Sequence, residues 1–142
     1  MQKIKIFAFL LLFSFFFSAC SDYQKVLNKG ATDEQYKLAV ELYEQKKFGK
    51  ALRLFEKVTP TYRGKPQMER IQFMVAQSNF NEKLYSEAGY YFERFTNNYP
   101  NSSKKEEAAY LSAYSYMLAS PRFSVDPAET EKAITALQGF IN

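Results

Sequence analysis

ERIQFMVAQSNFNEKLYSEAGYYFERFTNNYPNS, residues 69–102, contains the pattern from which the fold can be predicted. Ala76 and Phe80 lie four residues apart in its first half, and Ala88 and Phe92 lie four apart in its second half. An offset of four residues places two side chains on the same face of an α-helix. The Tyr-Pro-Asn-Ser sequence at the end of the segment stops a helix. We therefore predict two antiparallel helices that cross closely at the two alanines.

The same arrangement recurs before and after this segment. The first alanine has counterparts 37 residues earlier and later, at Ala39 and Ala113, and the second has counterparts at Ala51 and Ala133. A helix pair of this kind cannot bury its apolar face alone, so neighbouring pairs must stack. The pattern resembles the tetratricopeptide repeat, which has a period of about 34 residues. We predict an all-α fold, a tetratricopeptide-repeat superhelix of antiparallel helix pairs with about two and a half repeats present; the alternative is one irregular helical bundle.

The repeat domain is expected at residues 33–142. Its repeats are predicted at about 33–65, 66–102 and 103–142, and its helices at 34–45, 48–59, 67–81, 85–98, 104–119 and 127–141. An insertion around residues 120–127 contains two prolines and is expected to be a structured loop. The third repeat is incomplete, because its closing proline would fall beyond Asn142. We therefore expect the chain to be the N-terminal portion of a longer protein.

The N-terminus predicts export and lipid attachment. Lys3 and Lys5 precede an uncharged apolar run at residues 6–19, which is shorter than the roughly 20 residues that span a bilayer. This is the pattern of a signal peptide, predicted at residues 1–19. The run ends in Phe17-Ser18-Ala19-Cys20, which looks like a bacterial lipobox and includes the only cysteine of the chain.

A lipobox implies that Cys20 becomes the first mature residue and carries a diacylglycerol and an N-acyl chain. More than one acyl chain gives stable membrane attachment. Ser21, rather than an aspartate, follows the cysteine, which favours the outer membrane, with the protein facing the periplasm. Residues 20–32 have little apolar periodicity and are expected to form a lipidated tether. The alternative is an ordinary signal peptide that happens to contain a cysteine.

Composition argues against several classes of function. Removing the signal peptide takes two lysines from the 19 Lys and Arg, leaving 17 against 15 acidic residues, so no basic surface for nucleic acid is expected. The chain has no histidine, which excludes imidazole bases and histidine metal ligands. The only thiol is assigned to lipid. We therefore expect no enzyme activity, no metal and no cofactor other than the lipid on Cys20.

Three segments carry a family resemblance: residues 43–64, residues 85–102, and EEAAYLSAYSY at 106–116 followed by Ser-Pro-Arg at 120–122. They resemble the BamD family, lipoprotein subunits of the β-barrel assembly machinery. The resemblance covers nearly the whole mature chain, and members usually have five repeats. It implies a non-enzymatic role in folding and inserting β-barrel proteins into the outer membrane. The implied partners are a BamA-type barrel protein, the other subunits of the machinery, and the C-terminal targeting strands of unfolded substrates. The alternatives are a pilus-secretin pilotin, a cell-constriction coordinator or a surface glycan-binding lipoprotein.

In a tetratricopeptide repeat the first helix of each pair lines the concave face. The residues predicted there, as a peptide-binding groove, are Tyr36, Val40, Tyr43, Phe73, Gln77, Phe80, Tyr110 and Tyr114. Tyr36, Phe73 and Tyr110 share one position of the repeat and are expected to form an aromatic strip. Arg70 is expected to pair with the terminal carboxylate of a bound peptide. The alternative is that these rings only pack between helices.

Overall fold

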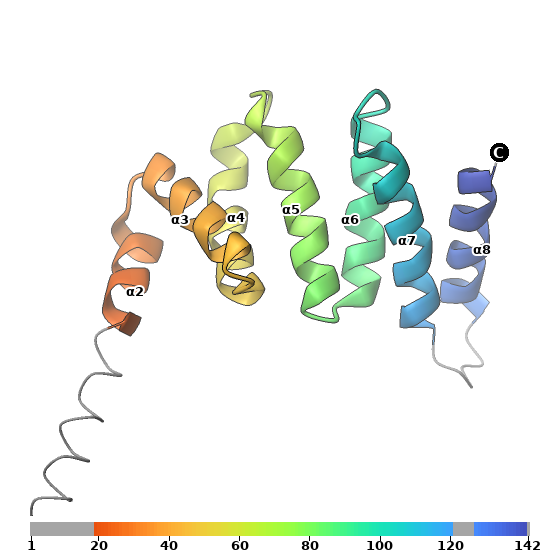
Figure 1. Ribbon diagram of the computed structural model, residues 1–142, viewed down its shortest axis with the longest axis horizontal. Coiled ribbons are helices and arrows are strands. Elements are labelled where there is room, and N and C mark those ends of the chain that lie inside the picture. The colour runs from red at the N-terminus through yellow and green to blue at the C-terminus, as the bar shows by residue number, and fades with distance from the viewer. Residues whose placement is uncertain (1–18, 121–126, 142) are drawn as a thin grey trace, which may run out of the picture.

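A computed structural model describes residues 19–120 and 127–141 of the 142-residue chain. Every regular element within these residues is an α-helix (Figure 1): α2 Ala19–Lys29, α3 Thr32–Glu44, α4 Phe48–Tyr62, α5 Gln67–Asn81, α6 Tyr85–Asn98, α7 Lys105–Ala119 and α8 Pro127–Ile141. The all-α repeat fold is thereby confirmed. The predicted signal peptide, apart from Ala19, and the predicted loop after Ser120 lie outside the described residues.

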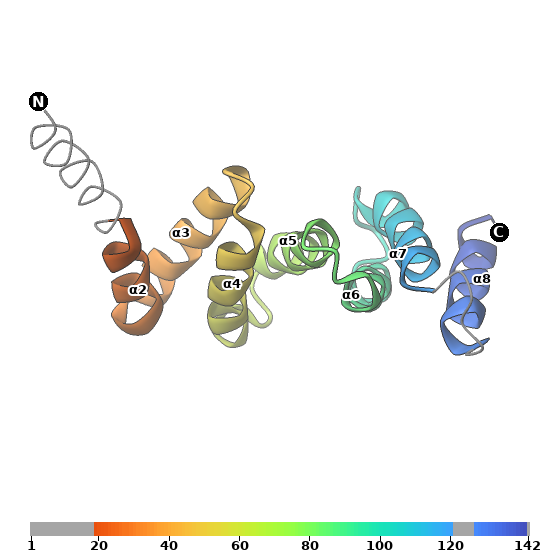
Figure 2. The same ribbon diagram turned by 90° about the horizontal axis from the view of Figure 1, so that it is seen from below.

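The six helices expected in the repeat domain are all present, and their ends agree with the prediction to within three residues. Consecutive helices pack against one another from α3 to α8. Figure 2 shows α3, α5 and α7 along one side of the array, with α4, α6 and α8 along the other. This is the two-layer arrangement of stacked helix pairs.

The alanines that defined the repeat lie at helix crossings. Five of them, Ala39, Ala51, Ala76, Ala88 and Ala113, are completely buried, and Ala133 is almost so. A methyl side chain lets two helix backbones approach more closely than a larger side chain would. Larger neighbours fill the space one turn away: Phe55 and Phe92 follow Ala51 and Ala88 by four residues and are also completely buried.

The turns inside the first two pairs are built alike. Lys46 and Lys83 occupy equivalent positions and both have left-handed backbone angles, with φ of 59° and 63°. At the first turn the Lys47 amide donates to the Leu42 carbonyl, and at the second the Leu84 amide donates to the Asn79 carbonyl. Such bonds close the end of a helix in a Schellman motif. The sequence repeat is therefore also a repeat of backbone geometry.

Buried apolar side chains form two clusters. The first joins α2, α3, α4 and α5, and the second joins α5, α6 and α7. Helix α5 contributes to both, with Ile71 and Met74 in the first and Phe73 and Ala76 in the second. It is therefore the shared wall of the two clusters.

Helix α4 continues beyond its predicted end at residue 59. Pro60 lies inside its last turn, and the helix ends at Tyr62. A proline in a helix removes one hydrogen bond and normally favours termination. Here Tyr62 is buried and its hydroxyl donates to Asp33 Oδ1 at 2.8 Å, which ties the last turn of α4 to the start of α3. Gly64, with φ of 75°, then reverses the chain.

The segment expected to be a tether is instead largely helical. Helix α2 covers Ala19–Lys29, and its Tyr23 and Leu27 are buried in the first cluster. The Tyr23 hydroxyl donates to the Lys50 carbonyl at 3.2 Å. Gln35 Nε2 donates to the carbonyls of Val26 and Leu27, each at 3.1 Å. These contacts stabilise a helix whose own apolar pattern is too short to predict it.

Candidate functional site

A hollow of about 470 Å³ lies between the first helices of the three repeats. Helices α3, α5 and α7 contribute most of its lining, and α6 contributes one ring. The lining residues are Tyr43, Pro66, Glu69, Arg70, Phe73, Met74, Gln77, Phe95, Lys104 and Glu107. The hollow therefore lies on the helices where the repeat pattern predicts a groove, and four of the predicted residues, Tyr43, Arg70, Phe73 and Gln77, line it.

Tyr43 links two of these helices. Its hydroxyl donates a hydrogen bond to Gln77 Oε1, and its ring lies edge-on to Phe48, with the ring centroids 5.6 Å apart. Burial raises the pKa of the Tyr43 phenol, the Glu107 carboxylate raises it further, and Arg70 lowers it. The phenol therefore remains protonated at neutral pH and acts as a hydrogen-bond donor.

Phe73 belongs to the second core cluster and leaves only 9% of its surface exposed. Its ring packs edge-on against Phe92 and Phe95, at centroid distances of 5.8 and 5.3 Å. The Lys104 ammonium lies 5.4 Å from the centre of the Phe73 ring. Phe73 therefore forms a wall of the hollow, and packing accounts for most of its surface.

Tyr36, Phe73 and Tyr110, the residues of the expected aromatic strip, contact different neighbouring rings. Tyr36 is half-buried and packs on Tyr62, with the ring centroids 5.1 Å apart. Tyr110 is 49% exposed and stacks on Tyr114, which in turn contacts Phe80. Apart from Phe73, none of these rings lines the hollow between α3, α5 and α7. Neighbouring side chains thus turn rings at equivalent repeat positions in different directions.

Val40 is also outside this hollow and packs against the first core cluster. The predicted residues therefore separate into two groups. Tyr43, Arg70, Phe73 and Gln77 come together, whereas Tyr36, Val40, Phe80, Tyr110 and Tyr114 lie elsewhere on the first helices.

Charged residues line the hollow beside the rings. Arg70 Nη2 lies 3.7 Å from Glu44 Oε1, and both side chains are mostly exposed, at 58% and 66%. Such an exposed ion pair contributes only about 0–1 kcal/mol and therefore costs little to break. Lys104 Nζ lies 2.7 Å from Glu107 Oε2. The hollow therefore offers two cations, with Arg70 the less firmly held.

Sequence reasoning missed Glu69, Lys104 and Glu107. Glu69 Oε1 accepts a hydrogen bond from the Ser102 hydroxyl at 2.6 Å, across the two ends of the second repeat. Glu107 follows Arg70 by one 37-residue repeat. That equivalence could have placed Glu107 beside the hollow, because equivalent positions of stacked repeats face the same side.

Two features are absent from the part of the chain that the structure describes. Residues 19–120 and 127–141 contain no group of three or more acidic, histidine or cysteine side chains placed to hold a metal ion. No helix in this part of the chain is both long and apolar enough to cross a membrane. The side chain of Cys20 is outside the described structure.

Comparison with known proteins gives the family. The model of the family described as YfiO, outer membrane lipoprotein, matches residues 28–142. The chain is also 26% identical over 127 residues to a protein of Aquifex aeolicus (strain VF5) named putative outer membrane protein assembly factor BamD. That alignment covers 84% of this chain and 40% of the relative, so the chain spans less than half the relative's length. The family match includes all three repeats, and the resemblance to the BamD family is confirmed: the chain belongs to the YfiO family of outer membrane lipoproteins.

Proposed function

We propose that this protein is a non-enzymatic lipoprotein that assists the folding and insertion of β-barrel proteins at the outer membrane. Family membership supports the role in assembly. We further propose that the hollow between α3, α5 and α7 receives the C-terminal targeting strand of a substrate. The observation that carries this second proposal is the lining of the hollow, where aromatic rings lie beside an arginine whose ion pair is weak.

The chemistry of the hollow suits a peptide end. The rings of Phe73 and Phe95 supply apolar surface, and the Tyr43 hydroxyl and Gln77 amide supply hydrogen-bonding groups. Arg70 can exchange its weak contact with Glu44 for the terminal carboxylate of the peptide, because guanidinium groups bind carboxylates through two parallel hydrogen bonds. Extended peptides bind where main-chain contacts and side-chain pockets occur together.

Binding is tested with the unlipidated mature chain and a fluorescent peptide copied from the C-terminal strand of an outer-membrane barrel protein. Phe73→Ala is unsuitable, because removing a buried Phe ring costs about 3–5 kcal/mol and would confuse folding with binding. The Arg70→Gln, Lys104→Gln double variant changes two exposed side chains instead. We expect at least tenfold weaker binding, which corresponds to about 1.4 kcal/mol.

Two controls make this test specific. Arg53→Gln removes an exposed arginine of α4 that lies outside the hollow, and should leave affinity unchanged. Amidating the C-terminus of the peptide removes its terminal carboxylate. The amidated peptide should therefore bind the unaltered chain only as weakly as the peptide with a free carboxylate binds the double variant. If the folded double variant bound the free peptide as tightly as the unaltered chain does, the strand would have to bind elsewhere.

We also propose that Cys20 carries the lipid that attaches the protein to the periplasmic side of the outer membrane. Helix α2 begins at Ala19, and Tyr23, less than one turn beyond Cys20, is already buried. Such an anchor would hold the repeats close to the bilayer, without a long tether. Fatty-acid labelling of the cells should mark the unaltered protein and leave Cys20→Ser unlabelled. An unlabelled wild-type protein, soluble in the periplasm, would contradict the proposal.

The proposed partners are a BamA-type barrel protein and the other subunits of the assembly machinery. Affinity purification of the full-length protein from cells should recover them. Recovery of a secretin or a cell-division complex in their place would favour the alternative of a different envelope repeat lipoprotein, and retention on glycan beads would favour a glycan-binding lipoprotein.

A further inference from the structure

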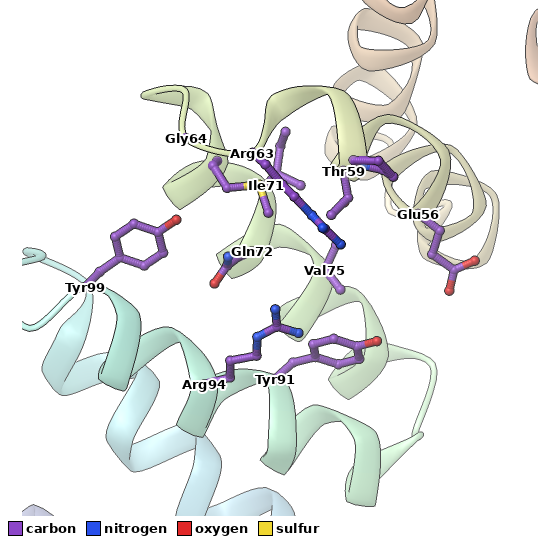
Figure 3. A pocket seen from close by; sticks show the side chains of 12 residues that line it. Glu56, Thr59, Arg63, Gly64, Ile71, Gln72, Val75, Tyr91, Arg94 and Tyr99 are labelled. Atoms are coloured by element: carbon purple, nitrogen blue, oxygen red, sulfur yellow. The ribbon is translucent and has the colours of Figure 1, made fainter.

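A second hollow, of about 690 Å³, lies between α4 and α6 with α5 at its base (Figure 3). Its lining residues are Glu56, Thr59, Pro60, Arg63, Gly64, Met68, Ile71, Gln72, Val75, Tyr91, Arg94 and Tyr99. Its volume is within the range of about 300–1,000 Å³ that is usual for ligand sites. The proposed strand-binding hollow shares none of these residues.

The two hollows lie on opposite faces of α5. Met68, Ile71 and Val75 line the second hollow, whereas Arg70 and Gln77 line the first. Residues three, four and seven apart share a helix face, and at 3.6 residues per turn these two sets point in nearly opposite directions. The second hollow is therefore a separate surface, formed by the second helices of the first two repeats together with one face of α5.

The base of this hollow is apolar. Ile71 is completely buried, and Met68 and Val75 are nearly so. The aromatic rings of Tyr91 and Tyr99, contributed by α6 and the residue that follows it, stand at the sides. Burial raises the pKa of Tyr99, Glu69 raises it further and Arg94 lowers it, so the phenol is a protonated donor at neutral pH. An occupant would place an apolar group on this base.

Two arginines enter the hollow from opposite sides. Arg63 directly follows α4, Arg94 lies in α6, and Figure 3 shows both guanidinium groups pointing into the hollow. Among the described residues neither has a carboxylate within 4.0 Å. Glu56, the acidic residue of the lining, points its carboxylate away from them in Figure 3. Two unpaired cations beside an apolar base are complementary to an anionic, partly apolar occupant.

We propose that this hollow binds an acidic peptide segment of a partner protein, with an apolar side chain on the α5 base and a neighbouring carboxylate between Arg63 and Arg94. The planar guanidinium group matches a carboxylate through two parallel hydrogen bonds. An anionic lipid bilayer is a less suitable occupant, because segments that recognise such bilayers typically carry clusters of about four to eight Lys and Arg. Here two cations face a recess between helices.

The test uses the unlipidated mature chain and a fluorescent nonapeptide, Gly-Ser-Leu-Asp-Phe-Asp-Leu-Ser-Gly, with a matched peptide in which Asn replaces both Asp. The acidic peptide should bind at least tenfold more tightly than the amide peptide. The Arg63→Gln, Arg94→Gln double variant should lose this preference, while Arg53→Gln keeps it. In NMR spectra, methyl resonances of Met68, Ile71 and Val75 should shift on binding and those of α8 should not.

Each contrary outcome overturns the proposal. The proposal is wrong if the acidic peptide does not bind at millimolar concentration. It is also wrong if the Arg63→Gln, Arg94→Gln variant binds this peptide as tightly as the unaltered chain does. Vesicles of phosphatidylglycerol that bind the unaltered chain but not this variant, with no peptide preference, would assign the arginines to lipid headgroups. Because Arg70→Gln, Lys104→Gln should leave acidic-peptide binding intact, failure here is distinguishable from failure of the strand-binding proposal.

Discussion

Gly89→Ala tests whether α6 and α7 approach as closely as the structure indicates. A Cβ atom added at Gly89 would lie 2.7 Å from Cδ1 and Cε1 of Tyr116 and 3.0 Å from its Cγ. Real side chains do not tolerate such distances, so one of the helices or the ring must move. The Ser112 hydroxyl donates to the Gly89 carbonyl at 2.9 Å, which adds a second link at the same crossing.

The Tyr116 ring has little freedom to move aside. It is 3% exposed, and its hydroxyl donates to Glu93 Oε2 at 2.9 Å, while the Lys132 ammonium lies 5.8 Å from the ring centre. In an unobstructed helix, Ala is about 1 kcal/mol more favourable than Gly. Overpacking a core costs about 1–3 kcal/mol. With the ring held, we expect the overpacking cost to prevail and the unfolding free energy to fall, by up to about 2 kcal/mol once the helix gain is subtracted.

The assay is thermal and urea unfolding followed by circular dichroism. Gly139→Ala is the matched control, because Gly139 also lies in a helix but a Cβ there would meet nothing within 4 Å. That control should be neutral or up to about 1 kcal/mol more stable. In a Tyr116→Ala background, where the ring is absent, Gly89→Ala should no longer be destabilising. If Gly89→Ala raised the melting temperature as much as Gly139→Ala, the close approach of α6 and α7 would be wrong.

Two further predictions concern α2 and the first repeat that it packs against. Tyr23→Ala with Leu27→Ala should release α2 from α3 and α4, because each change removes a buried side chain and a buried Leu→Ala alone costs about 2–5 kcal/mol. Amide hydrogen exchange should then accelerate in residues 22–29 and stay slow in α6. Unchanged protection of the α2 amides would contradict the packing of this helix. Burial, followed by the hydrogen bond and charge of Asp33, raises the pKa of Tyr62 from 10 to about 12. Because the folded state holds the phenol neutral, Tyr62 stabilises the fold below pH 10, and this contribution is lost as the pH rises towards 12. In urea unfolding, the unfolding free energy of Tyr62→Phe should therefore fall less steeply between about pH 10 and 12 than that of the unaltered chain. An equally steep fall in both proteins would refute the assignment.

The helix pairs could be predicted from sequence because their signal is local and repeated. Ala39 and Ala76 each specify a close crossing within one repeat, and stacking copies of that unit fixes the rest of the array. Helix α2 could not be predicted in this way. Its apolar contacts come mainly from Tyr23 and Leu27, and the polar contacts that hold it come from Gln35 and the backbone of α4, which no local pattern reveals.

The candidate site was only partly predictable for a related reason. A repeat position specifies which face of a helix a residue occupies, but neighbouring side chains decide where its ring turns. Phe73 meets Phe92 and Phe95 and turns into the core, whereas Tyr110 meets Tyr114 and stays half exposed. The pattern therefore located the groove and left the ring directions undetermined.

The second hollow could not be predicted from the sequence, because Arg63 and Arg94 belong to different repeats. They line one hollow only because α4 and α6 flank α5 in the folded chain. Since the buried side chains of α5 support both hollows, a substitution at Ile71 or Met74 would disturb the first core cluster together with either surface. Substitutions of exposed cations at the edges of the hollows, such as Arg70 and Arg94, change the charge of the surface without removing core volume. Variants at these cations can therefore separate the two proposed binding surfaces, and variants in the core of α5 cannot.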